Sequence, residues 1–244
     1  MRTISIIIIL SIALLHHSGC SKPGCLGSKG AIVTHERMLS AFDSLVVEDN
    51  IEVELVQSST NKVEITAGEN ILPNVLTINE GHVLRISNST DCRWLRDASE
   101  RIRLRLFFTD LSHIEYKASG DLRNADTLRM NRLLVESTIG AGDIDLTIDM
   151  ESFAYVIFSE NAGVRLRGRA AWCGGYTDAR SQLDLSQLTA RTIDIEYGGL
   201  GDTEVHATEE LSVRIFYHGN VYYRGNPLIT RKEEFSTGRL IHLP

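Results

Sequence analysis

The 244-residue sequence has little of what builds most enzymes and helical proteins. It contains four cysteines, four prolines and 7% aromatic residues, and no stretch has the 3.6-residue period of an amphipathic helix. No Cys/His spacing typical of a zinc site is present, and neither a Gly-x-Ser-x-Gly motif nor a phosphate loop occurs. We therefore expect an all-β protein without a catalytic motif, a metal or a cofactor.

Positive charge is also scarce. The 25 basic residues face 32 acidic ones, for a net charge of −7. Nucleic-acid binding depends on cationic contacts to phosphate, so this balance argues against a nucleic-acid partner.

The one long apolar run, residues 4–15, predicts a signal peptide over residues 1–19. The run is too short for a bilayer, which needs about twenty residues. The segment ending at Cys20 resembles the lipobox of bacterial lipoproteins, although His17 stands where an aliphatic residue is usual. The resemblance implies lipidation of Cys20. The alternative is an ordinary signal peptide with Cys20 free or in a disulfide.

Residues 20–40 are expected to be the lipidated N-terminus and a flexible tether, because residues 21–30 are rich in Gly, Ser and Lys. Residues 41–244 are expected to form a single β domain. Three cysteines remain when Cys20 is set aside: Cys25, Cys92 and Cys173. They allow at most one disulfide, and the sequence leaves the pairing open.

A short phrase recurs through residues 118–223: a small residue, a polar residue, then alternating apolar residues. The residue two places after each small residue marks the repeat, at Leu122, Ile144, Val164, Leu183, Thr203 and Val221. Spacings of 22, 20, 19, 20 and 18 are typical of a solenoid whose coils stack to bury a shared core. A sandwich of β-hairpins also fits short strands with Gly turns, but the fixed place of the phrase in each repeat favours a β-solenoid with coils of about 18–22 residues.

The small residue is most often Gly. We expect it either to adopt a positive φ or to permit a backbone approach that a Cβ would block.

Before the repeat, short alternating runs predict six strands. They cover residues 45–47, 51–56, 63–65, 76–78, 83–86 and 102–106. The polar segment 89–100, which holds Cys92 and Trp94, is predicted to be a loop.

Several motifs together point to one family. They are Phe42-Asp43 before the first strand, the Leu-x-Ile run at residues 84–86, the Gly-Asp-Ile phrases, and the ending Tyr-Arg-Gly-Asn-Pro at residues 223–227. Over roughly residues 42–241 the chain resembles the head GIN domain family of auto-transporter adhesins, which are bacterial lipoproteins. It keeps only fragments of the Gly-Ser-Gly-Asp turns usual in that family. The resemblance implies a right-handed β-helix similar in shape to pectin-lyase folds, a Bacteroidetes-like source and an adhesive role.

Carboxylates beside the turns are the first candidate site: Asp121, Asp143, Asp145, Asp184 and Asp202. Equivalent residues on adjacent coils lie about 4.8 Å apart, close enough to share Ca²⁺. However, Gly163, Gln182 and Asn220 interrupt the row. Asp is also a favoured corner residue that accepts backbone hydrogen bonds, and we favour that structural interpretation.

Tyrosines spaced by 21, 21 and 20 residues are the second candidate site: Tyr155, Tyr176, Tyr197 and Tyr217. Stacked outward, they would form a sugar-binding platform. Their register drifts against the repeat, so they do not share one ladder position, and packing in the core or at an edge is the favoured interpretation.

The leading functional hypothesis is a lipid-anchored, non-enzymatic β-helix of the cell envelope, at the outer membrane, serving adhesion or scaffolding. Its expected partners are the membrane, through the lipid, and a polysaccharide or another envelope protein. Lys22 and Lys29 favour the periplasmic face, since surface-export signals tend to be acidic. The alternative is a lyase-like, polysaccharide-active enzyme that uses the Asp row.

Overall fold

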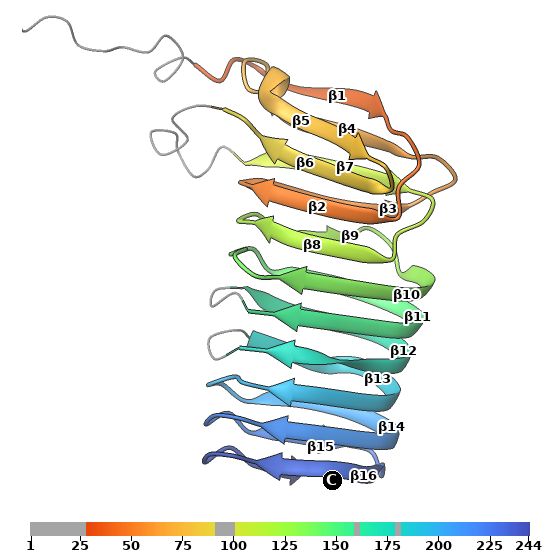
Figure 1. Ribbon diagram of the computed structural model, residues 1–244, viewed down its shortest axis with the longest axis vertical. Coiled ribbons are helices and arrows are strands. Elements are labelled where there is room, and N and C mark those ends of the chain that lie inside the picture. Colours follow the sequence, from red (N-terminus) through yellow and green to blue (C-terminus); the bar gives the residue numbers. More distant parts are fainter. Residues whose placement is uncertain (1–27, 91–100, 159–161, 179–181) are drawn as a thin grey trace, which may run out of the picture.

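The computed structural model describes residues 28–90, 101–158, 162–178 and 182–244. These residues form a rod-shaped β-solenoid that begins with β1 at one end and finishes with β17 at the other (Figure 1). The only helical turn in the described ranges is the 3₁₀ turn η2 (Leu72–Asn74). No helix in them is long and apolar enough to cross a membrane. The predicted all-β solenoid is confirmed.

Nine short strands make up the N-terminal half. They are β1 (Ile32–Met38), β2 (Ser44–Asp49), β3 (Ile51–Gln57), β4 (Lys62–Gly68), β5 (Val75–Glu80), β6 (Val83–Asn88), β7 (Ile102–Phe108), β8 (His113–Ala118) and β9 (Leu122–Asn124). All six strands expected before the repeat are present, as β2 to β7. The segment predicted as a loop, residues 89–100, lies almost entirely outside the described residues.

The C-terminal half contains longer strands. They are β10 (Leu128–Ser137), β11 (Ile144–Ile157), β12 (Gly163–Thr177), β13 (Gln182–Tyr197), β14 (Thr203–Ile215), β15 (Val221–Arg224), β16 (Leu228–Glu234) and β17 (Leu240–His242).

Each coil of this half has two sides because its long strand bends in the middle. The first halves of β11 to β14 stack with β3, β7, β9, β15 and β17 to form wall A. The second halves stack with β2, β6, β8, β10 and β16 to form wall B. The bends form one long edge of the rod, and the loops from wall B to wall A form the other, here called the loop edge (Figure 1). Alternate side chains of both walls fill the space between them.

The predicted register of the repeat is confirmed at four of its five steps. Leu122 pairs with Ile144, Ile144 with Val164, Val164 with Leu183, and Thr203 with Val221. The six anchor residues are at most 4% exposed, so stacking of the repeat builds the core.

The step from Leu183 to Thr203 is different. The ladder between β13 and β14 starts only at Thr189 and His206. Thr189 comes six residues after the anchor Leu183 in β13, whereas its partner His206 comes three residues after the anchor Thr203 in β14. Coils of unequal circumference cannot keep every hydrogen bond in register.

One of the two reasons proposed for the glycines at the turns is correct. A Cβ on Gly142 would lie 1.5 Å from the carbonyl oxygen of Gly120, which no structure permits. None of the turn glycines that precede the anchors has a positive φ. Positive φ occurs instead at the bends, as at Gly168, where φ is 102°. Gly120, Gly142 and Gly219 are therefore needed for close backbone approach, whereas a Cβ on Gly201 would meet no atom within 4 Å.

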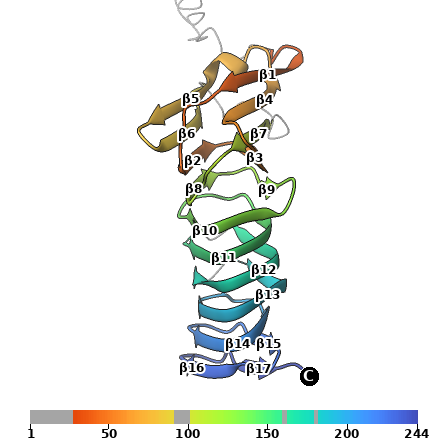
Figure 2. The same ribbon diagram turned by 90° about the vertical axis from the view of Figure 1, so that its right-hand side faces the viewer.

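The coils at the N-terminal end do not follow chain order. β2 pairs in parallel with both β6 and β8, and β3 with both β7 and β9. The coil of β6 and β7 thus lies outside the earlier coil of β2 and β3. Antiparallel strands finish this end, with β4 between β1 and β7, and β5 beside β6 (Figure 2).

The predicted tether over residues 20–40 is wrong for residues 32–38, which form β1. This strand pairs with β4 through its backbone, and most of its side chains are exposed. It therefore lacks the apolar alternation that marks a half-buried strand. The predicted signal peptide, the candidate lipidation site Cys20, and also Cys25 and Cys92 lie outside the described residues.

Candidate functional site

Three of the five candidate aspartates lie on the loop edge and connect successive coils. Asp121 Oδ1 accepts a hydrogen bond from the backbone N–H of Asp143 at 3.2 Å, and Asp143 Oδ1 accepts one from Gly163 N–H at 3.0 Å. Asp202 Oδ1 accepts one from Asn220 N–H at 2.8 Å. Asn220 Oδ1 in turn accepts from the N–H of the next coil, at Arg239. The interpretation of Asp as a corner residue is confirmed here, and Asn220 continues the row with a neutral acceptor.

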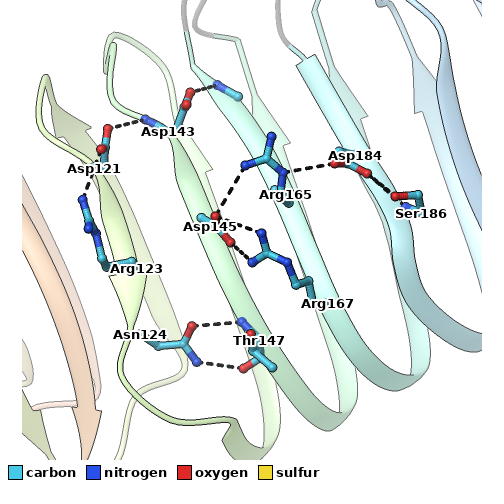
Figure 3. A network of polar contacts seen from close by, with 11 residues as sticks. Asp121, Arg123, Asn124, Asp143, Asp145, Thr147, Arg165, Arg167, Asp184 and Ser186 are labelled. Atoms are coloured by element: carbon cyan, nitrogen blue, oxygen red, sulfur yellow. Dashed lines mark hydrogen bonds and ion pairs between the residues drawn. The ribbon is translucent and has the colours of Figure 1, made fainter.

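The other two aspartates lie on the outer surface of wall A (Figure 3). Arg165 lies between them, with Nε 3.1 Å from Asp184 Oδ2 and Nη1 3.5 Å from Asp145 Oδ2. Arg167 also forms an ion pair with Asp145. A guanidinium therefore occupies the position between two carboxylates that a shared Ca²⁺ would need. Among the described residues no group of three or more His, Cys, Asp and Glu is arranged to hold a metal ion.

Asp184 has further partners at a bulge in β13. Its Oδ1 accepts hydrogen bonds from the N–H and the hydroxyl of Ser186, at 3.1 and 2.7 Å. Burial opposes ionisation of this carboxyl, but the bonds from Ser186 and Arg165 outweigh it and lower the pKa of Asp184. The Asp184 carboxylate is thus already engaged by Ser186 and Arg165 of the same chain.

Between β13 and β14 the surface of wall A is hollowed. The missing ladder opens a depression of about 730 Å³, lined by Asp184, Asp202, Leu200 and Tyr222 among others. The Thr203 hydroxyl donates to the carbonyl oxygen of Leu183 at 2.7 Å and so replaces one lost backbone bond. Two of the candidate aspartates are brought together at this depression.

The tyrosine series does not form a platform, as the drifting register indicated. Tyr155 and Tyr197 are each 1% exposed and belong to the core. Burial, then the charge of Asp202, raises the pKa of Tyr197 to about 12, and its hydroxyl donates to the carbonyl oxygen of Gly201 at 2.6 Å. Tyr176 is half-buried, and Tyr217 is 42% exposed beside the loop edge.

A different set of aromatic rings does form a continuous surface row, at the junction of wall B with the loop edge. The ring centroids of Phe158 and Tyr176 are 5.1 Å apart, those of Tyr176 and Phe216 6.4 Å, and those of Phe216 and Phe235 5.3 Å. We call Phe158, Tyr176, Phe216 and Phe235 the aromatic row. Only Tyr176 was among the sequence candidates.

A sequence signal for this row exists. Phe158, Phe216 and Phe235 each directly follow the last paired residue of a wall B strand. Counting from the ends of these strands aligns the three phenylalanines. Counting tyrosines at a constant spacing does not.

Comparison with protein families finds one match, "Putative auto-transporter adhesin, head GIN domain", over residues 41–227. The chain belongs to this family. The family resemblance expected from the sequence is thereby confirmed, and adhesins of this family point to a location at the cell surface or envelope. No curated protein sequence matches the chain significantly.

Solved structures share the fold. A putative adhesin from Bacteroides fragilis NCTC 9343 superposes with a TM-score of 0.78 at 18% identity, covering 87% of this chain and 97% of that one. A putative adhesin and a putative lipid binding protein, both from Parabacteroides distasonis ATCC 8503, each give a TM-score of 0.66 at 16% identity, covering 88% of this chain and 98% of theirs. At these identities the likeness shows the fold alone.

Proposed function

We propose that this head GIN domain protein is a non-enzymatic adhesin of the cell envelope, anchored at the outer membrane through lipidated Cys20. The observation that carries the proposal is the direction of the chain along the rod. The described chain enters at one end with β1 and leaves at the other with β17 (Figure 1). An N-terminal anchor therefore holds the rod by one end and leaves its long sides accessible.

The segment before β1 has a suitable length. Residues 28–31 are held beside the end of β4, where the N–H groups of Asn70 and Glu69 donate to the carbonyl oxygens of Lys29 and Ala31. Seven residues, 21–27, separate Cys20 from this segment. Extended chain spans about 3.3–3.6 Å per residue, so seven residues reach at most about 25 Å. That reach lets the rod take many orientations above a membrane surface.

The carboxylates offered for the lyase-like alternative do not favour it. Asp121, Asp143 and Asp202 accept backbone hydrogen bonds between coils. Asp145 and Asp184 are bound to Arg165. A general base needs a carboxylate available to the substrate, so binding without turnover is the better use of this surface.

Cell fractionation tests the anchor. In a Gram-negative host, the full-length chain should sediment with the outer membrane, and Cys20→Ala should move to the soluble fraction or remain unprocessed. Cys25→Ala is the matched control and should fractionate like the parent. Membrane retention and normal cleavage of Cys20→Ala would overturn the anchor.

Adhesion and catalysis need separate measurements. Cells that display the chain should adhere to polysaccharide-coated surfaces, and protease added outside should remove both the chain and the adhesion. A chain protected from that protease lies on the periplasmic face that Lys22 and Lys29 favour. That result would leave scaffolding within the envelope as its role and would overturn the adhesive role. Release of reducing ends or unsaturated sugars from neutral or acidic polysaccharides, with or without Ca²⁺, would overturn the non-enzymatic assignment.

A further inference from the structure

The aromatic row runs along the axis of the rod. Five residues occupy equivalent positions on successive coils, since the N–H of each donates to the last wall B carbonyl of the coil before it. They are Phe158, Asp178, Gly198, Phe216 and Phe235. Adjacent coils are about 4.8 Å apart, so these positions span about 19 Å. Tyr176 and Phe216 approach each other across the coil of Gly198, which has no side chain to separate them.

The two end rings of the row are open to solvent, whereas Tyr176 and Phe216 are half-buried, and the position itself does not require apolar residues. Phe158 is 50% exposed and Phe235 61%. The equivalent position also holds Asp178. On the opposite edge of the rod, Leu228 beside the last bend is exposed, and the other exposed bend residues are polar: Asp126, Glu151, Arg191, Glu209 and Asn226. Exposed aromatic side chains thus gather along one edge.

Two carboxylates, Asp178 and Glu196, and one guanidinium, Arg214, lie beside the row. Burial, followed by the charge of Asp178 and the nearby Tyr217 and Glu196, raises the pKa of the Tyr176 hydroxyl. Glu196 is held in place by its ion pair with Arg214. Carboxylates next to ring faces suit a ligand that has both apolar C–H faces and hydroxyl donors.

We propose that the aromatic row binds an extended, uncharged polysaccharide chain that lies parallel to the rod axis. This assignment rests on the adhesive function proposed above and names its ligand class. Phe216 and Phe235 are stacked on each other with 5° between their ring planes. The C–H faces of the pyranose rings therefore contact the parts of the aromatic rings that remain exposed, and the sugar hydroxyls donate to the neighbouring carboxylates. The ring centroids are 5.1, 6.4 and 5.3 Å apart, close to the advance of one sugar in an extended β-1,4-linked chain, so successive rings meet successive sugars.

Two other occupants fit the surroundings less well. Single-stranded nucleic acid also stacks on aromatic rows, but it needs a basic groove that tracks the phosphates. An anionic membrane surface attracts basic residues and is repelled by acidic ones. Among the described residues, the aromatic row has Asp178 and Glu196 beside it, and the guanidinium of Arg214 is paired with Glu196, which disfavours both.

Calorimetric titration of the chain with cello-, xylo- and chito-oligosaccharides of two to six sugars tests the assignment. We expect binding to at least one series, with affinity that rises up to four or five sugars and then stays constant, because the row spans five coil positions. Maltohexaose, whose α-linkage makes the chain curve, should bind at least tenfold more weakly. Absence of binding to all three β-linked series would overturn the proposal.

Two double variants locate the site. Phe158→Ser with Phe235→Ser removes both ends of the row and should lower the affinity at least tenfold. The control, Ile139→Ser with Leu228→Ser, removes side chains that are 74% and 67% exposed and should change affinity less than twofold. Both should keep the circular dichroism spectrum of the parent. Equal affinity of the row variant and the parent would place the ligand elsewhere and overturn the proposal.

Three further measurements, vesicle sedimentation, cell adhesion and cell fractionation, distinguish failure of this proposal from failure of the proposed function. If the parent sediments with phosphatidylethanolamine/phosphatidylglycerol vesicles and the row variant does not, the row binds lipid and the polysaccharide assignment fails. If cells displaying the row variant adhere like cells displaying the parent, the row is not the adhesive site although adhesion stands. If the purified chain binds oligosaccharides but is found in the soluble fraction, the anchored function fails and the row remains a sugar site.

Discussion

Replacement of a buried tyrosine by phenylalanine should affect the free energy of unfolding differently at Tyr116 and at Tyr155. The Tyr116 hydroxyl donates to the carbonyl oxygens of Gly120 at 2.8 Å and Ile51 at 3.1 Å, and so joins two coils. The Tyr155 hydroxyl is buried without a hydrogen-bond partner among the described residues. Loss of a buried hydrogen bond costs about 1–3 kcal/mol when a partner is left unsatisfied, whereas removal of an unpaired polar group is neutral or stabilising. Tyr116→Phe should therefore destabilise the protein by about 1–3 kcal/mol, and Tyr155→Phe should not destabilise it.

Urea unfolding of both variants beside the parent measures the difference. For a chain of this size 1 kcal/mol corresponds to about 2–4 °C in Tm, so thermal melts provide a second readout. Both variants keep the aromatic ring, which makes each the packing control for the other. A loss of stability in Tyr155→Phe as large as that in Tyr116→Phe would show that the Tyr155 hydroxyl has a partner and would refute the reasoning.

Three further predictions concern the repeat, the acidic row and pH. Ile144 is 0% exposed, so Ile144→Asp should lower the free energy of unfolding by several kcal/mol. Asp143→Ala removes one exposed hydrogen bond to Gly163 and should lower it by about 1 kcal/mol or less. Equal Tm values for the two variants would contradict the register. Because Arg165 separates Asp145 from Asp184, Ca²⁺ or chelator should leave Tm unchanged, and a rise with Ca²⁺ would show a metal site. Burial raises the pKa of Cys173 from 9.0 to about 12. The contribution of this thiol to the free energy of unfolding should therefore be fully present below pH 9 and be lost between pH 9 and 12, because in that range only the thiol of the unfolded chain ionises. Cys173→Ala should reduce that loss, as measured by urea unfolding at each pH.

The sequence predicts the repeat because one physical requirement recurs at a constant interval. Leu122, Ile144 and Val164 must be apolar because they stack between the walls, and each is at most 2% exposed. Stacking also brings Gly142 onto the backbone at Gly120. Wherever a coil repeats the geometry of the coil before it, the residue pattern repeats too. The strand register and the buried side chains of that coil can then be predicted from the sequence.

The candidate site is less predictable because it depends on distances across the stack. The interpretation as corner residues is correct for Asp121, Asp143 and Asp202, each of which accepts a backbone hydrogen bond from the equivalent turn of the next coil. The aromatic row requires knowledge of where each wall B strand ends. Gly198 also contributes to it, by the absence of a side chain between Tyr176 and Phe216. No spacing rule detects a contact made across an intervening coil.

The order of the first coils shows a limit of a different kind. Strands β2, β6 and β8 place apolar residues at the same inward positions of wall B, although only β6 and β8 alternate strictly, since Val46 of β2 is buried as well. Because any two of them satisfy one another's backbone hydrogen bonds, the pattern is equally compatible with several stacking orders. What selects the observed order is the antiparallel pairing of β4 with β7 and of β5 with β6, which places the coil of β6 and β7 outside that of β2 and β3. The pairing of β5 with β6 is a local hairpin that turns at Gly81, where φ is 64°. The pairing of β4 with β7 joins residues more distant in the sequence, such as Lys62 and Phe107, so it is decided by the packing of the whole N-terminal end and leaves no mark in either segment.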